Sequence, residues 1–348
     1  MVEKPPNFGF TATGIGSVPF LEVEATCREI NRLFPHMPFW PQFVKRSYLE
    51  DMSVQYSEGL PLLVVNEEKR SLAVSRTGER ESELVRFYER FFAEDIEAFA
   101  ISEAYAPGLY ALMASLDEVN SGQINYIKGQ TVGPITFTSG ILGLDGRPVI
   151  HDPELSEALV RGLAIKALWQ VRELEKSGRR PVIFLDEPSL SAVGSAFSSI
   201  QRQDVIDNLQ MMISYLKGHS DCLVGIHCCG NTDWAMIMAA GPDIINFDAF
   251  EFMEHFLLYP EGIASFLQGG GTIAWGIVPT SGFTGDESEK ELLKKVGDGI
   301  KKIEQTGISP QTIAERSIFT PSCGMGSMTP GNARSAMNML ARLRDGVL

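Results

Sequence analysis

Apolar runs and amphipathic stretches alternate along most of this chain. The apolar runs have the length of buried strands, and apolar residues at helical spacing fill most of the gaps between them. Six strands are predicted at Asn125 to Pro134, Pro181 to Pro188, Cys222 to Cys229, Ile244 to Phe250, Thr272 to Pro279 and Ile318 to Gly324. A further strand is predicted within residues 9 to 19, where it runs into a glycine-rich turn.

The predicted helices lie between these strands or before them. They cover Leu21 to Leu33, residues 79 to 98, Glu154 to Lys176, Asp204 to Lys217, Trp234 to Ala240, Glu287 to Glu304 and Asn332 to Leu343. Residues 34 to 52 are rich in proline and aromatic side chains, which favours an irregular covering excursion. Strands that alternate with helices indicate a parallel sheet, and about eight strands with polar strand ends favour a (β/α)8 TIM barrel. We therefore expect a single domain over residues 1–348, a TIM barrel with an irregular N-terminal excursion.

The composition excludes some classes of binding partner and indicates the cellular compartment. A formal net charge of -14 over 348 residues argues against nucleic acid and anionic membranes, because both repel an acidic surface. No apolar run approaches the length of a transmembrane helix, and Met1 to Pro19 lacks the basic-then-apolar order of a signal peptide. Five cysteines, two of them adjacent, fit a reducing compartment better than a disulfide framework. We therefore expect a cytoplasmic protein.

Residues 223 to 230, LVGIHCCG, form an apolar run that ends in a histidine, two cysteines and a glycine. Alternate side chains of a strand point to the same face, so His227 and Cys229 share one side while Cys228 points to the other. An isolated pair of this kind is most often a buried cysteine beside a core histidine.

Two further strand ends change that interpretation. The apolar run at residues 243 to 248 ends in Asp248, and the run at residues 317 to 324 ends in Cys323 and a glycine. The strand ends then offer an imidazole, a carboxylate and two thiolates, a ligand set that suits zinc. Other polar groups stand at strand ends too, namely Ser17 in the glycine-rich turn and Asp186 with Glu187.

The order of these motifs resembles a known family. T-x-x-G-I-G-S, G-P-x-T, D-E-P, H-x-C, D-x-I-x-x-[DE] and P-x-C-G follow one another as in the catalytic C-terminal half of cobalamin-independent methionine synthase, in the superfamily of uroporphyrinogen decarboxylase. The resemblance spans residues 9 to about 330. It implies a zinc ion held by His227, Cys229, Asp248 and Cys323. Asp248 stands where the family has a glutamate, and Glu251 is a weaker alternative.

The resemblance also implies an amino-acid substrate, homocysteine, whose thiol would be activated by the zinc. The backbone of Ile15, Gly16 and Ser17 would hold the substrate carboxylate. The carboxylate of Asp186 would hold the ammonium, with Glu58 as a second partner. From the residues alone, Asp186 could equally be a helix cap or part of a strand-end salt bridge. The resemblance implies no catalytic residue beyond the zinc site.

Three departures from the folate-dependent members bear on the methyl donor. Gly140, Ala192 and Ser281 stand where those members have a stacking tryptophan, a pterin-binding glutamate and a histidine proton donor. Folate leaves as an amine and needs an acid, whereas a cobalt(I) corrinoid needs no proton. The departures therefore favour methylcobalamin or a methylated corrinoid protein as the donor, as in short, core-only members of the family.

These observations predict a zinc-dependent methyltransferase that makes methionine from homocysteine and a methyl-corrinoid. Two alternatives stay open: a corrinoid- or folate-dependent methyltransferase for another thiol, and a zinc- or corrinoid-binding accessory protein without turnover. A decarboxylase of the uroporphyrinogen type fits less well, because it would require several N-terminal arginines for substrate carboxylates, and Lys45 and Arg46 are the only obvious candidates there.

Overall fold

The computed structural model describes residues 6–77, 79–116, 126–194 and 199–347. Its centre is a sheet of seven parallel strands in the order β1-β9-β8-β7-β6-β5-β4. These strands are β1 (Thr11–Ala12), β4 (Tyr126–Val132), β5 (Arg180–Asp186), β6 (Leu223–Cys228), β7 (Ile244–Phe247), β8 (Thr272–Val278) and β9 (Ser317–Pro321). The alternation of strands with helices and the parallel sheet are thereby confirmed.

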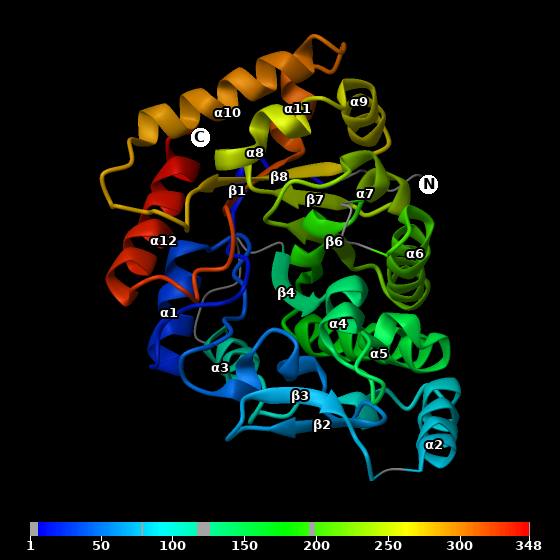
Figure 1. Cartoon of the computed structure of the whole chain (residues 1–348). Helices are drawn as coiled ribbons and strands as arrows, with labels where there is room; N and C mark the ends of the chain where they lie inside the picture. Colours follow the sequence, from blue (N-terminus) through cyan, green and yellow to red (C-terminus); the bar gives the residue numbers. More distant parts are fainter. Residues whose placement is uncertain (1–5, 78, 117–125, 195–198, 348) are drawn as a thin grey trace.

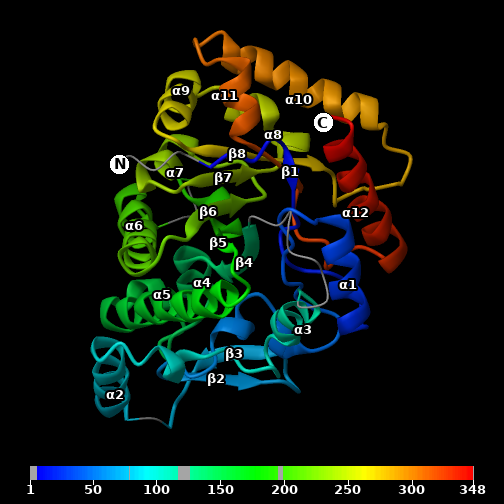
Figure 2. The same ribbon diagram turned by 180° about the vertical axis from the view of Figure 1, so that it is seen from behind.

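Helices cover the outside of this curled sheet (Figure 1; Figure 2). They are α1 (Val23–Leu33), α3 (Pro107–Leu116), α4 (Pro134–Gly140), α5 (Pro153–Glu175), α6 (Arg202–His219), α7 (Trp234–Ala240), α8 (Ala249–Phe256), α9 (Pro260–Gln268), α10 (Glu289–Glu304), α11 (Pro310–Glu315) and α12 (Pro330–Asp345). A hairpin of β2 (Leu63–Asn66) and β3 (Ser71–Val74) lies with α2 (Arg80–Phe92) at the end of the molecule away from α10. None of the helices in the described part of the chain is both long and apolar enough to cross a membrane.

The prediction of a closed eight-stranded TIM barrel is wrong. β1 and β4 are the edges of the sheet, and no eighth strand forms a ladder between them in the described residues. The chain that lies there makes only isolated bridges, from Phe39 to Lys128 on one side and from Gln42 to Ser17 on the other. Prolines at positions 35, 38 and 41 explain this, because proline has no N–H and breaks the regular hydrogen bonding of a strand.

The face enclosed by the sheet changes character along the strands. Near its amino end it is apolar, and the side chains packed there are Phe8, Met37, Val182, Phe184, Leu223, Ile244, Ala274 and Ile318. Towards the carboxyl ends the inward positions become polar, with Asp186 on β5, His227 on β6 and Asn246 on β7. Alternation along β6 is confirmed as well, because Cys228 is buried in the separate core that the helices cover. Asp186, His227 and Asn246 therefore gather at one end of the enclosed face.

Candidate metal centre

Three of the predicted ligands come together at the carboxyl end of the sheet. The ligand atoms of His227, Cys229 and Cys323 all lie within 4.8 Å of one another. His227 is the penultimate residue of β6, and the two cysteines follow β6 and β9. Since β7 and β8 separate these strands in the sheet, the curl of the sheet is what brings their ends together. The donor set of one imidazole and two thiols fits zinc, which binds nitrogen and sulfur ligands.

A hydrogen-bonded asparagine orients the histidine. Asn246 donates through Nδ2 to the carbonyl of Ala274 at 2.9 Å and to Thr320 Oγ1 at 2.8 Å. Its Oδ1 is therefore the acceptor, and His227 Nδ1 donates to it at 2.5 Å. In the neutral imidazole, Nε2 then carries the lone pair that a metal ion requires. Asn246 was not predicted; the only signal for it was an amide inside an apolar run.

The two cysteines share one proton. The hydrogen bond from the Cys323 thiol is the main reason that the pKa of Cys229 is lowered to about 4, and a hydrogen bond and the charge of His227 add to it. The pKa of Cys323 is raised in turn, first by its hydrogen bond to Cys229 and then by burial. The thiolate, which is the form that binds metal, is therefore favoured at Cys229 over Cys323.

The predicted carboxylate ligand lies beside this group but outside it. Asp248 Oδ1 accepts a hydrogen bond from the amide of Glu251 at 2.8 Å and caps the N-terminus of α8. Burial is the main cause that raises the pKa of Asp248 to about 6, and the charge of Cys229 contributes. The strand predicted to continue to Phe250 ends at Phe247 instead, because α8 begins at Ala249. Glu251 is solvent-exposed.

Asp186 is the least satisfied charged group near the metal ligands. It lies opposite His227 in the register between β5 and β6, and only 4% of it is exposed. Its Oδ1 has no hydrogen-bond partner among the residues that the structure describes. Burial raises its pKa to about 6, while the charges of His227 and Lys128 oppose that shift. A buried, unpartnered carboxylate is costly unless a ligand completes it.

Its neighbour in the sequence has a structural role. Glu187 is fully buried and accepts hydrogen bonds from the amides of Ile135 and Thr136 at the start of α4, and from the Thr136 hydroxyl. Glu187 therefore stabilises the turn between β4 and α4, leaving Asp186 as the open carboxylate.

The turn of Ile15, Gly16 and Ser17 packs directly against the loop that carries Cys323. The carbonyl of Ser17 accepts from the amide of Met325 at 2.9 Å. A side chain at Gly324 would approach Ser17 Oγ to 2.2 Å, so only glycine fits there. Within the described ranges, the amides of Ile15, Gly16 and Ser17 make no hydrogen bond, which leaves three donors open beside a metal ligand.

Glu58 contacts residues outside the predicted site. Its carboxylate accepts from the amide of Ser102 at 2.8 Å and interacts with the buried ammonium of Lys166 on α5. Sequence reasoning missed a charged residue that interacts with Asp186. Lys128 on β4 is fully buried on the enclosed face; burial lowers its pKa to about 7, and Asp186 opposes that shift. A lysine inside a predicted strand was the signal for it.

The three positions that depart from the folate-dependent pattern are all exposed. Gly140 ends α4 with open space where a side chain would be, and both Ala192 and Ser281 face solvent. They therefore supply neither an aromatic platform nor an ionisable group.

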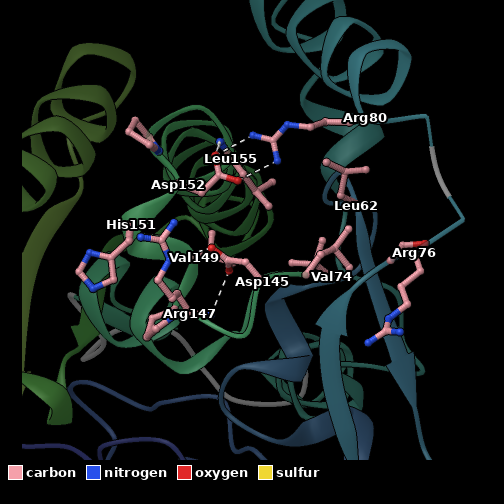
Figure 3. Close-up of a pocket in the computed structure, with 15 residues that line it drawn as sticks. Leu62, Val74, Arg76, Arg80, Asp145, Arg147, Val149, His151, Asp152 and Leu155 are labelled. Carbon is pink, nitrogen blue, oxygen red and sulfur yellow. Dashed lines mark hydrogen bonds and ion pairs between the residues drawn. The ribbon is translucent and has the colours of Figure 1, made fainter.

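A cavity of about 450 Å³ lies elsewhere, between hairpin β2–β3 and the chain leading into α5 (Figure 3). It includes none of the metal-ligand candidates. Arg80 at its border donates to both oxygens of Asp152, and Arg147 donates to Asp145 (Figure 3).

Comparison with known proteins adds little. No family model matches the chain, and no curated protein does. Among the similar solved structures is one described as a Xaa-Pro dipeptidase with bound methionine in the active site, with a TM-score of 0.30 and 13% identity over 68% of this chain and 69% of the other. A likeness this weak carries no argument about fold or function.

Proposed function

We propose that this protein is a zinc-dependent methyltransferase that forms methionine by moving a methyl group from methylcobalamin or a methyl-corrinoid protein to the thiol of homocysteine. The observation that carries the proposal is the buried Asp186 carboxylate, unpartnered at Oδ1 and in register with His227. A metal-ligand cluster beside an open carboxylate is what a thiol bearing an ammonium group requires. The ordered motifs that resemble cobalamin-independent methionine synthase support the same assignment.

His227, Cys229 and Cys323 would hold the metal, and Asp248 is the candidate for a further ligand because its charge already interacts with Cys229. When bound, zinc would stabilise the thiolate form of the substrate at neutral pH, where a free alkyl thiol with a pKa near ~8.5 is mostly protonated. Asn246 keeps the His227 ring in the orientation and tautomer that this task needs.

The head group would be held from two sides. Asp186 takes the ammonium, and the three open amides of Ile15, Gly16 and Ser17 take the carboxylate. Because Ser17 is bonded to the loop after Cys323, these amides and that metal ligand move as one unit. The chain therefore aligns the substrate sulfur with the metal ligands by fixing the opposite end of the same molecule.

In the reaction, a C–S bond forms and the Co–C bond breaks, with its electron pair staying on cobalt. No proton is needed by this leaving group, and Ser281 offers none to a folate amine. The free thiols of the described chain suit a reducing environment, so we place the reaction in the cytoplasm.

The test is methionine formation by zinc-loaded protein with homocysteine and either methylcobalamin or methyl-folate at equal concentration. We expect turnover with the corrinoid and near-background turnover with the folate, since lack of a general acid alone costs about 10²- to 10⁴-fold in rate. Faster turnover with methyl-folate would refute the corrinoid donor. Transfer to other thiols but not to homocysteine would favour a different acceptor, and no transfer to any thiol would favour a binding protein.

A further inference from the structure

We propose that Lys128 is a positioning residue that gives the site its preference for a carboxylate, by acting on the substrate through the peptide group between Ile15 and Gly16. This inference rests on the proposed function and adds to it a residue outside the motifs discussed above. It also assigns the two ends of the amino-acid head group to different parts of the fold.

The position of Lys128 is unusual for a lysine. Its side chain is fully buried on the enclosed face of β4, with Nζ 4.5 Å from the centre of the Phe184 ring. Nζ donates to the carbonyl of Ile15 at 2.5 Å and to Gln130 Oε1 at 3.3 Å. A buried ammonium is costly unless the surrounding groups use its charge, so a role in binding explains why it is there.

The Ile15 carbonyl links Lys128 to the peptide group that Ile15 shares with Gly16. The described residues contain no cis peptide bond, so the Ile15 carbonyl and the Gly16 amide point in opposite directions from one planar group. A cation bonded to the carbonyl polarises the peptide and strengthens the amide as a donor on its other side. That amide is one of the three without a partner in the described chain.

Close packing holds this peptide in place. A side chain at Gly16 would come within 2.7 Å of Gln42 Oε1 and 2.9 Å of Gln130 Cδ, so the backbone lies directly against both glutamines. The peptide group to which Lys128 donates therefore has no room to rotate.

The two charges of the enclosed face are divided between the two ends of the ligand. Lys128 donates to Ile15 and Gln130, while Asp186 Oδ1 is left without a hydrogen-bond partner among the described residues. Asp186 is thus available to bind the substrate ammonium. The positive charge of Lys128 acts instead on the turn of Ile15, Gly16 and Ser17, which binds the substrate carboxylate in the proposed function. Lys128 should therefore matter most for ligands that carry a carboxylate.

The experiment compares Lys128→Met with wild type, both zinc-loaded, by calorimetric titration with four thiols. Homocysteine carries both charged groups, 4-mercaptobutanoate only the carboxylate, 3-aminopropanethiol only the ammonium, and propanethiol neither. We expect unchanged zinc content and about ten- to a hundredfold weaker binding of homocysteine and 4-mercaptobutanoate, in line with loss of a charge-assisted hydrogen bond. Binding of 3-aminopropanethiol and propanethiol should not weaken.

Lys166→Met is the matched control. Lys166 is equally buried and donates to the carbonyls of Phe99 and Ala100 at 3.3 and 3.4 Å, next to Glu58 and outside the metal cluster. Its loss should lower the melting temperature without changing the relative affinities of the four thiols. If Lys128→Met does not fold, the same four titrations are made with Lys128→Gln. The amide of this variant can still donate to Ile15 but carries no charge, so the same selective weakening is expected.

The possible results separate this inference from the proposed function. If Lys128→Met weakens the binding of all four thiols equally, or weakens the binding of none, the role of Lys128 is overturned. The proposed function still stands in that case if wild-type protein binds homocysteine more tightly than propanethiol. Wild-type protein that binds homocysteine no more tightly than propanethiol overturns the proposed function, and this inference with it.

Discussion

The cavity beside hairpin β2–β3 and the metal cluster at the carboxyl end of the sheet differ in how their charges are satisfied. At the cavity, Arg80 lies 2.7 Å from Asp152 and Arg147 lies 2.7 Å from Asp145, so opposite charges meet in pairs. At the metal cluster, Asp186 is buried and its Oδ1 has no hydrogen-bond partner in the described chain. At the cavity the carboxylates are therefore paired with cations, whereas at the metal cluster one carboxylate oxygen is left open.

This difference is the reason for proposing the function at the metal cluster and not at the cavity. Partly exposed ion pairs such as those at the cavity contribute about 0–1 kcal/mol and can be lost without consequence. Burial disfavours the charged form of Asp186 and raises its pKa, and a ligand that bonds Oδ1 would offset that penalty. Substitutions at three places test the comparison, in order of decreasing effect.

The largest effect is expected at the cysteines. Cys229→Ala or Cys323→Ala should remove zinc and abolish methyl transfer, because two remaining protein ligands hold the ion poorly. Metal content by mass spectrometry and methionine formation are the measurements. Cys228→Ala is the control. Cys228 is buried in the helix-covered core, so this variant should retain zinc. Loss of zinc from Cys228→Ala alone would mean that Cys229 and Cys323 do not hold the metal.

A smaller effect is expected at the open carboxylate. Asp186→Asn should leave zinc content unchanged and weaken homocysteine binding by about 2 to 5 kcal/mol, the range for a buried charge that loses its partner. Asp145→Asn at the cavity should not change homocysteine affinity, because that carboxylate is exposed and already paired with Arg147. Titration calorimetry on both variants measures the contrast. Equal affinities for Asp186→Asn and wild type would mean that Asp186 is a structural residue.

The smallest effect is expected at the cavity. Arg80→Ala removes the cation that bonds Asp152 and Glu154, and these side chains are between 38% and 65% exposed. We expect a loss of about 1 kcal/mol or less in the free energy of unfolding, with methyl transfer unchanged. Denaturant unfolding and the methionine assay check the two parts. A large fall in activity with normal stability would show that the cavity has a role in catalysis.

Local patterns were sufficient for several elements of the site. The alternation of residues 223 to 228 predicted that Cys228 faces away from His227, and the two cores of the structure separate these faces. The apolar runs also predicted β4, β5, β6 and β8 to within two residues at each end, because buried parallel strands are recognisable from their own composition, whereas β9 ends three residues before its predicted end. β7 was predicted too long, because an aspartate after an apolar run can end a strand or cap a helix, and Asp248 caps α8.

What the sequence determined by itself is therefore the set of reactive side chains and the face of each strand on which they lie, since both follow from backbone geometry over a few residues. Only the tertiary structure decided which of them meet. β6 and β9 are brought together by the curl of the sheet across β7 and β8, and the prolines between its edges leave it open. Glu58 bonds Ser102 while Lys128, on another strand, bonds Ile15. Such partners depend on contacts far apart in the chain, which no local periodicity records.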